Sequence, residues 1–204
     1  MNIGLIGSFV LSGILALGIA MNNQRIQTSS NELLVRQLKQ SKVNTLAEIV
    51  SYDISKIGYN INDVSNVTLT KAEDYKINFF ANIDNSEDGS LEEVKWEWLK
   101  NEGVSIDDTE NPNDFLLFRS INGVHTDVLG GVVEFVMHYY DEYGQETWLP
   151  TPVSAEDFAR VKQISVKIIV ESESPISTGP GKTPEYVQTS WEKRFSPINL
   201  RDNN

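Results

Sequence analysis

The chain opens with a long apolar stretch. Residues 3–21 read IGLIGSFVLSGILALGIAM, and no charged side chain occurs before Arg25. As an α-helix, nineteen residues rise about 28 Å, which is close to the ~30 Å hydrocarbon core of a bilayer. The pattern therefore predicts a membrane-spanning helix.

The apolar pattern continues past this stretch at helical spacing. Apolar residues recur three, four or seven positions apart, as on one face of a helix. They are Ile26, Leu33, Leu34, Leu38, Leu46, Ile49, Val50, Ile54 and Ile57. No proline precedes Pro112, and Gly58 is suited to end a helix. We expect one helix from residue 3 to about residue 57, on the order of 80 Å long.

Three parts follow from this pattern. Residues 1–24 form a transmembrane half-helix, residues 25–60 an amphipathic half-helix, and residues 61–204 a head domain. A cleaved signal peptide is the main alternative, since Ala16 and Ala20 resemble a cleavage site. Against it, no basic residue precedes the apolar run, and the run is longer than the ~7–15 residues usual in a signal peptide.

After Gly58 the apolar period changes from helical to two, which predicts strands. The expected strands are Tyr75–Ile83, Glu92–Trp98, Phe115–Arg119, Gly131–Tyr140, Val161–Glu171 and Tyr186–Phe195. In the strongest of them Val133, Phe135, Met137 and Tyr139 should face the core. We expect turns at 84–89, 121–124 and 141–144, and a helical turn at 154–157 capped by Ser154.

Short turns between these strands predict an antiparallel sheet. One face of that sheet must be covered, and the amphipathic half of the long helix is the available cover. The expected fold class is α+β, with a long N-terminal helix packed on a small antiparallel sheet.

Charge is unevenly distributed. Residues 1–60 hold five basic and three acidic side chains, a net charge of +2, whereas the remainder holds twelve basic and twenty-six acidic ones, a net charge of −14. An acidic head argues against a nucleic-acid partner, because such binding depends on neutralising phosphates. The chain has no cysteine, which excludes disulfides, thiolate metal sites and cysteine nucleophiles.

This layout resembles the type IV pilins and type II secretion pseudopilins, and within them the minor pilin PilW and pseudopilin J class. The helix end IVSYDISKIGY (49–59), the first hairpin INFFANID (77–84) with EVKW (93–96), and the later segments LFRS (117–120), VEFVMHYYD (133–141) and FSPINL (195–200) carry the resemblance. It implies a pilin-like fold, no cofactor, and a structural rather than enzymatic role.

The family's processing signal is only partly matched. The signal is a basic leader, a glycine, and an apolar run with glutamate at its fifth position. Gly4 or Gly7 could precede the cut, but the fifth residue is then Phe9 or Ser12, and the first acidic residue of the chain is Glu32. Cleavage by a prepilin peptidase and N-terminal methylation are therefore expectations of the resemblance alone.

The resemblance also implies a location and partners. We expect a single span in the bacterial inner membrane, with the head periplasmic or extracellular and the helix bound to other pilins and to an inner-membrane assembly platform. The basic residues after the span would by themselves favour a cytoplasmic head. Leu5, Phe9, Ile14 and Leu17 are the residues expected to pack the helix bundle. The alternative is a membrane-anchored extracytoplasmic binding or sensor domain outside any filament.

Candidate chemistry in the head is sparse. Residues 84–89 (DNSEDG) resemble the start of a calcium loop, with Asp84 and Asp88 as weak ligands, but its twelfth position is Lys95 instead of glutamate. A plain hairpin turn is the favoured interpretation. His125 and His138 have no neighbour at metal-ligand spacing, and no hydrolase or phosphate-binding motif occurs. We expect no enzyme. The four tryptophans could form a partner-binding surface, but packing in the core or on a sheet face is favoured for at least two of them.

Overall fold

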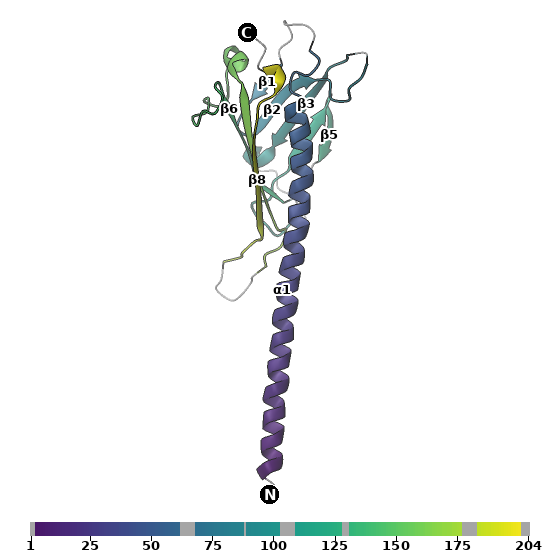
Figure 1. The fold of residues 1–204 in the computed structure, drawn as a ribbon, viewed down its shortest axis with the longest axis vertical. Coiled ribbons are helices and arrows are strands. Elements are labelled where there is room, and N and C mark those ends of the chain that lie inside the picture. Colours follow the sequence, from purple (N-terminus) through teal and green to yellow (C-terminus); the bar gives the residue numbers. More distant parts are fainter. Residues whose placement is uncertain are drawn as a thin grey trace.

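One helix dominates the molecule. The computed structural model describes residues 3–61, 68–87, 89–102, 109–127, 131–176 and 183–200. Helix α1 (Ile3–Ser55) runs for 53 residues, about 80 Å, and only its C-terminal part lies against the strands (Figure 1). The expected α+β architecture, a long N-terminal helix packed on antiparallel strands, is confirmed.

The strands divide over two antiparallel sheets where the sequence predicted one. The first sheet has the order β1-β2-β3-β4-β5 and the second the order β6-β7-β8. The bounds are β1 (Leu69–Ala72), β2 (Lys76–Ala81), β3 (Glu92–Trp98), β4 (Leu117–Ile121), β5 (Val124–Asp127), β6 (Val132–Tyr140), β7 (Gln163–Glu171) and β8 (Gln188–Phe195). Short 3-10 helices occur at Leu99–Glu102 (η1), Ala155–Arg160 (η2) and Ile198–Leu200 (η3).

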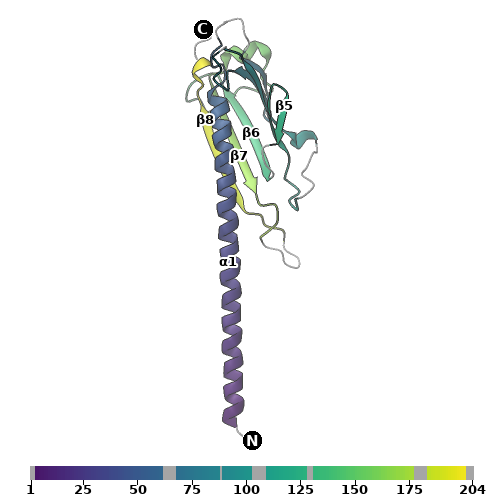
Figure 2. The ribbon, with the colours of Figure 1, turned by 90° about the vertical axis from the view of Figure 1, so that its right-hand side faces the viewer.

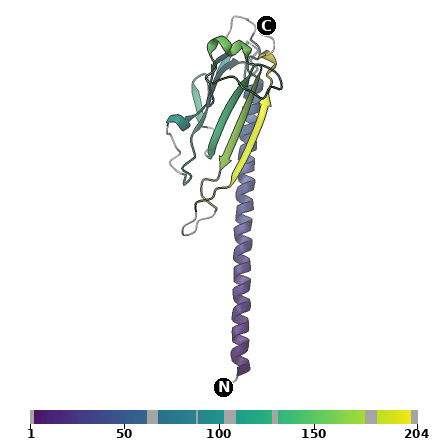
Figure 3. The same ribbon diagram turned by 90° about the vertical axis from the view of Figure 1, so that its left-hand side faces the viewer.

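The two sheets and α1 enclose one core. Figures 2 and 3 show the sheets to one side of the upper part of α1, with β8 running beside the helix. The described sheets join through a single bridge between Phe115 and Val132. Trp96 of the first sheet stacks on Phe135 of the second, with ring centroids 6.0 Å apart. The core is therefore shared, although the hydrogen-bonded ladder is not continuous.

The first hairpin follows its predicted pattern. Ile77 pairs with Trp96 and Phe79 with Val94, and all four side chains are fully buried. The alternation of apolar and polar residues was therefore a sufficient guide to which face of β2 and β3 packs inward.

Some local predictions differ from the structure. The strand predicted at Phe115–Arg119 is β4, which begins at Leu117, and the turn predicted at 121–124 is confirmed, but strand β5 after that turn was not predicted. Val133 is only half-buried, because the register shifts between Val132 and Glu134 and brings Val132 into the core instead. A bulge of this kind changes which residues face inward without leaving a mark in the apolar pattern.

The turn near Ser154 is helical as predicted, but its cap differs. The Ser154 hydroxyl donates to the Asp157 carboxylate (2.8 Å) and makes no side-chain cap to the backbone of η2. Asp157 also accepts from Arg160, so the Ser154 hydroxyl is turned toward this carboxylate and not toward the backbone N–H groups of η2.

Gly58 ends the long helix region. The helix stops at Ser55, two residues before the predicted end, and the chain reverses through residues 56–60. Gly58 has φ +73° and donates its N–H to Phe80 of β2 (3.0 Å). A Cβ there would lie 2.8 Å from Thr68 Cγ2 and 3.0 Å from Asn199 Cβ, so both backbone angle and space require glycine.

We expect Gly58→Ala to lower the free energy of unfolding by about 2–4 kcal/mol, through a strained backbone angle and a steric clash. Gly144→Ala is the matched control, since Gly144 has the same φ but nothing within 4 Å of a Cβ, and should cost about 1 kcal/mol. Denaturant unfolding of the full chain in detergent measures both. Equal losses would contradict the proposed crowding at Gly58.

Candidate functional site

The N-terminal half of α1 is a large apolar surface with no cover inside the molecule. The helix is long and apolar enough to cross a membrane, and none of its most apolar stretch, near the N-terminus, is buried inside the molecule. Its large apolar side chains are about half to three-quarters exposed: Ile6, Phe9, Val10, Leu11, Ile14, Leu15, Leu17, Ile19 and Met21. Such a surface needs either lipid or other protein around it.

The residues predicted for bundle packing lie in this half. Phe9, Ile14 and Leu17 are 71%, 66% and 65% exposed. Leu5 is in the helix, but its side chain lies outside the described residues. The five-residue step from Phe9 to Ile14 turns the helix by about 140°, so the three side chains do not share one face. They remain predictions, as do the processing positions Gly4 and Gly7, which are helical and have open space around them.

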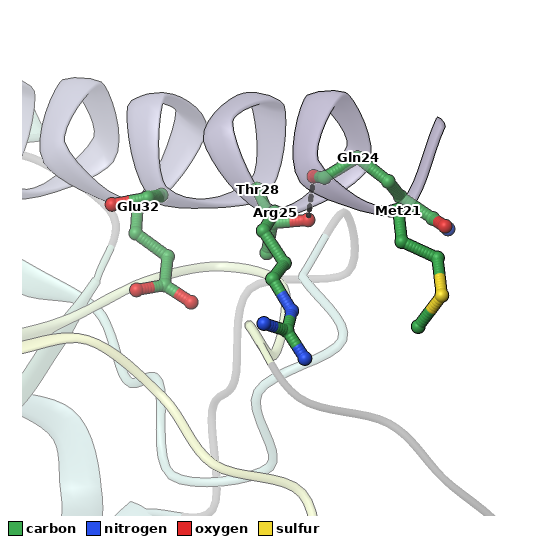
Figure 4. A pocket seen from close by; sticks show the side chains of 6 residues that line it. Met21, Gln24, Arg25, Thr28 and Glu32 are labelled. Carbon is green, nitrogen blue, oxygen red and sulfur yellow. Dashed lines mark hydrogen bonds between the residues drawn. The ribbon is translucent and has the colours of Figure 1, made fainter. Parts of the chain in front are cut away.

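One line of residues down α1 connects the free half to the head. Arg25, Glu32, Lys39, Leu46 and Asp53 are seven apart and so fall on nearly one face. The last three are buried against the head, whereas below it Arg25 is exposed and Glu32 is half-buried. Figure 4 shows the Arg25 and Glu32 side chains extending to the same side of the helix. The face below the head is therefore polar.

The apolar residues of the middle of α1 lie on its other faces. Ile26, Leu33, Leu34 and Leu38 were expected to cover the sheet, but each is 57–64% exposed. Packing on the strands begins at Lys39 and Val43 and continues through Leu46, Val50, Ile54 and Ile57. Helical spacing alone does not separate an apolar face that packs internally from one that awaits a neighbour.

A buried ion pair fixes the upper part of α1 to the first sheet. The Asp53 side chain is fully buried and accepts from Arg119 Nε (2.7 Å), Arg119 Nη2 (2.8 Å) and Trp96 Nε1 (2.8 Å). The Asp53 carboxylate raises the pKa of Arg119 above its ordinary value. Helix, β3 and β4 thus meet at one carboxylate, and a bidentate pair of this kind is geometrically specific.

Lys56 makes a second attachment at the helix end. Its ammonium donates to the backbone oxygens of Asn82 (3.1 Å) and Ile83 (3.0 Å) and to Asn85 Oδ1 (2.6 Å). It also lies 4.9 Å from the ring centroids of both Tyr52 and Tyr59. The loop between β2 and β3 is therefore held by the residue that directly follows α1.

A third attachment lies at the lower end of the head. Glu173, just after β7, accepts from Lys39 (3.0 Å) and Lys42 (3.1 Å), and these bonds lower the pKa of Glu173. Lys39 itself is only 6% exposed. Beside this cluster, an open groove of about 530 Å³ separates α1 from the segment 172–176, with Val35, Leu38 and Ile176 among its lining.

The lowered pKa of Glu173 predicts a pH dependence. An acid whose pKa is lowered by folding stabilises the fold above its ordinary value of 4.5, and loses that contribution as the pH falls through the folded value. Because Glu173 is half exposed, Glu173→Gln should cost at most about 1 kcal/mol at pH 7. Unfolding at pH 7 and at about pH 3 measures the difference from wild type, which should be smaller at the lower pH. The exposed Glu185→Gln is the control; a Glu173→Gln deficit that is undiminished at low pH would contradict the ion-pair account.

The other predicted sites have plain structural roles where they are described. Asp84 Oδ1 accepts from the Ser86 N–H (2.8 Å), as in a simple Asx turn, and Asp88 lies outside the described residues. Among the described residues no group of three or more histidine or acidic side chains could hold a metal. His138 stacks on Trp148 at 4.2 Å, and His125 meets the Phe118 ring edge-on. Trp96 and Trp98 are in the core, as predicted.

The sequence did not reveal the attachments made by Arg119, Lys39 and Glu173. The sequence did hold a signal for the Asp53–Arg119 pair. Asp53 interrupts the buried apolar stripe of α1, and a buried charge in that position needs a partner. The partner is 66 residues away, and nothing in the local pattern identifies it.

No protein-family model and no curated protein matches the chain. Among solved structures, a type IV-like pilin from Thermus thermophilus is similar over 79% of this chain and 97% of its own, with 12% identity and a TM-score of 0.44. Identity and TM-score at this level give no ground for carrying that protein's role over to this chain.

Proposed function

We propose that the chain is a structural subunit of the minor pilin or pseudopilin type, which assembles into or primes a type IV pilus or a type II secretion filament. The observation that carries the proposal is the uncovered apolar half of α1, continuous with a half that is firmly attached to a folded head. The family resemblance of the sequence supports it independently.

In this mechanism the apolar half stores the subunit in the inner membrane. On assembly it leaves lipid and packs against the helices of neighbouring subunits, so that lipid contact is exchanged for helix contact. Phe9, Ile14 and Leu17 would lie in those contacts. The exposed Leu33, Leu34 and Leu38 extend the same kind of surface beyond the membrane, where neighbours would cover it.

The three attachments between α1 and the head would hold each subunit rigid in an assembly. A force or contact on the helix reaches the sheets through Asp53, Lys56 and the Lys39–Glu173 pair. Because these bonds join α1 to both sheets, the head would move with its helix as one body.

Removal of residues 1–24 tests the proposal. The truncated chain should be released from the membrane and should no longer co-purify with neighbouring filament subunits from its native cells. A chain that lacks only the polar residues 22–24 is the control for truncation as such. If the released head still binds the same neighbours, the role of a tethered binding domain replaces that of a filament subunit.

A further inference from the structure

The edges of the two sheets are protected unequally. A free strand edge offers unpaired N–H and C=O groups to any other chain, so folded proteins cover or charge such edges. The outer edge of β1 is covered by Val153, whose N–H donates to Ala72 O (2.9 Å). The outer edge of β6 is covered by residues 73–74, where Met137 N–H donates to Asp74 O (2.8 Å).

The edge at β8 is protected in another way. It runs beside α1 (Figure 3) and carries three consecutive charged residues, Glu192, Lys193 and Arg194. Charged side chains on an edge disfavour pairing with a further strand. This leaves β5, the last strand of the first sheet.

One edge of strand β5 pairs with no strand among the described residues. Its residues pair with β4 from Ile121↔Val124 to Phe118↔Asp127, and no other described backbone group bonds to them. The turn between the strands is Asn122-Gly123, both with positive φ, so this is a two-residue hairpin. In such a hairpin the pair flanking the turn exchanges its hydrogen bonds and the pairs alternate from there. The N–H and C=O groups of His125 and Asp127 therefore point away from the sheet.

An apolar row of the first sheet ends at this edge, beyond which the described part of the chain places no strand. Val94, Ile121 and Val124 are neighbours across β3, β4 and β5 on the core-facing side. Val94 is fully buried, Ile121 half-buried, and Val124 71% exposed. A further strand beside β5 would bury Val124 and continue the row.

We propose that the free edge of β5 binds an extended strand of a neighbouring protein subunit. β5 contains no proline, lysine or bulge that would resist pairing, and its length of four residues and the charge of Asp127 at its end limit the ladder. The added strand carries a β-branched or aromatic side chain beside Val124, because main-chain bonds give such pairing its affinity and alternate side chains its specificity. It is not acidic, because residues 61–204 already carry a net charge of −14.

This inference shares with the proposed function only the requirement that the chain has neighbours in its native membrane. If the β5 edge proves unpaired while the full chain still assembles with its neighbours in the membrane, the strand pairing is refuted and the proposed function stands. Loss of co-purification on removing residues 1–24 supports the proposed function and leaves the strand pairing to the labelling test, because a ladder of four residues need not hold a neighbour without the helix.

Thiol labelling tests the edge, since the chain has no native cysteine. Val124→Cys and, as a control away from β5, Tyr143→Cys (Tyr143 is 51% exposed) are labelled with a maleimide reagent in native membranes and in the purified full chain in detergent. In membranes we expect Val124→Cys to react at least about tenfold more slowly than in detergent, and Tyr143→Cys to change less than about twofold.

Two second-site variants decide whether strand pairing causes the protection. His125→Pro removes an outward N–H, whereas His125→Ala keeps that N–H and removes only the ring. Added to Val124→Cys, the proline should restore fast labelling in membranes and the alanine should not. Equal labelling in membranes and detergent, or protection that survives the proline, would overturn the proposal. Protection that appears in the purified chain alone at high concentration would also overturn it, in favour of pairing between copies of the chain.

Discussion

Asp53→Ala should lower the free energy of unfolding of the head by about 3–5 kcal/mol, because it leaves the Arg119 guanidinium without its partner in a mostly buried site. The Arg119 side chain is 19% exposed and gives two of its N–H groups to Asp53. Trp96 Nε1 would lose its acceptor as well. Denaturant unfolding of the full chain in nonionic detergent, followed by tryptophan fluorescence, measures the loss.

Two further variants show whether the loss comes from the unpaired charge. Glu48→Ala removes an exposed carboxylate from the same helix and should change stability by less than about 0.5 kcal/mol. Arg119→Met added to Asp53→Ala should recover at least about 1 kcal/mol, since the double variant no longer buries a lone charge. A double variant as unstable as the sum of its single variants would contradict this origin.

Ile14→Lys should remove the chain from membranes and from any assembly that its helix joins. A lysine near the middle of a span costs about 2.5–3.5 kcal/mol on translocon-insertion scales, which is on the order of a hundredfold in the insertion equilibrium. Ile14 is 66% exposed, so no internal packing in this molecule is lost with it. The head should therefore remain folded, which separates this variant from Asp53→Ala.

Gln27→Lys is the matched control for Ile14→Lys. It adds the same charge to the same helix beyond the apolar stretch, at an exposed position. Quantitative blotting of membrane, soluble and co-purified fractions from native cells compares the two. Equal distribution of the two variants would mean that the apolar half of α1 does not depend on lipid or on helix contacts.

Elements set by local pattern could be predicted from the sequence. The length of α1, the first hairpin and its inward face, and the position of Gly58 follow from periodicity and turn residues that lie close together in the chain. The uncharged stretch before Arg25 also identified the apolar half of α1, which is the larger part of the candidate site.

Features that depend on contacts between distant residues could not be predicted. The split into two sheets and the Asp53–Arg119 pair are set by how segments far apart meet, and the bulge after Val132 is a change of register that residue type does not reveal. The exposure of Leu33, Leu34 and Leu38 shows the same limit, since their spacing suits internal packing as well as it suits a neighbour.

The central claim is that the apolar half of α1 changes its surroundings from lipid to protein on assembly. A photo-reactive benzophenone residue in place of Ile14 tests this most directly, with cross-linked products compared between the inner membrane and the sheared cell-surface fraction of native cells. The account predicts mainly lipid adducts in the membrane and adducts with neighbouring subunits at the surface. A chain confined to the membrane, with lipid adducts alone, would contradict it and leave a tethered head domain.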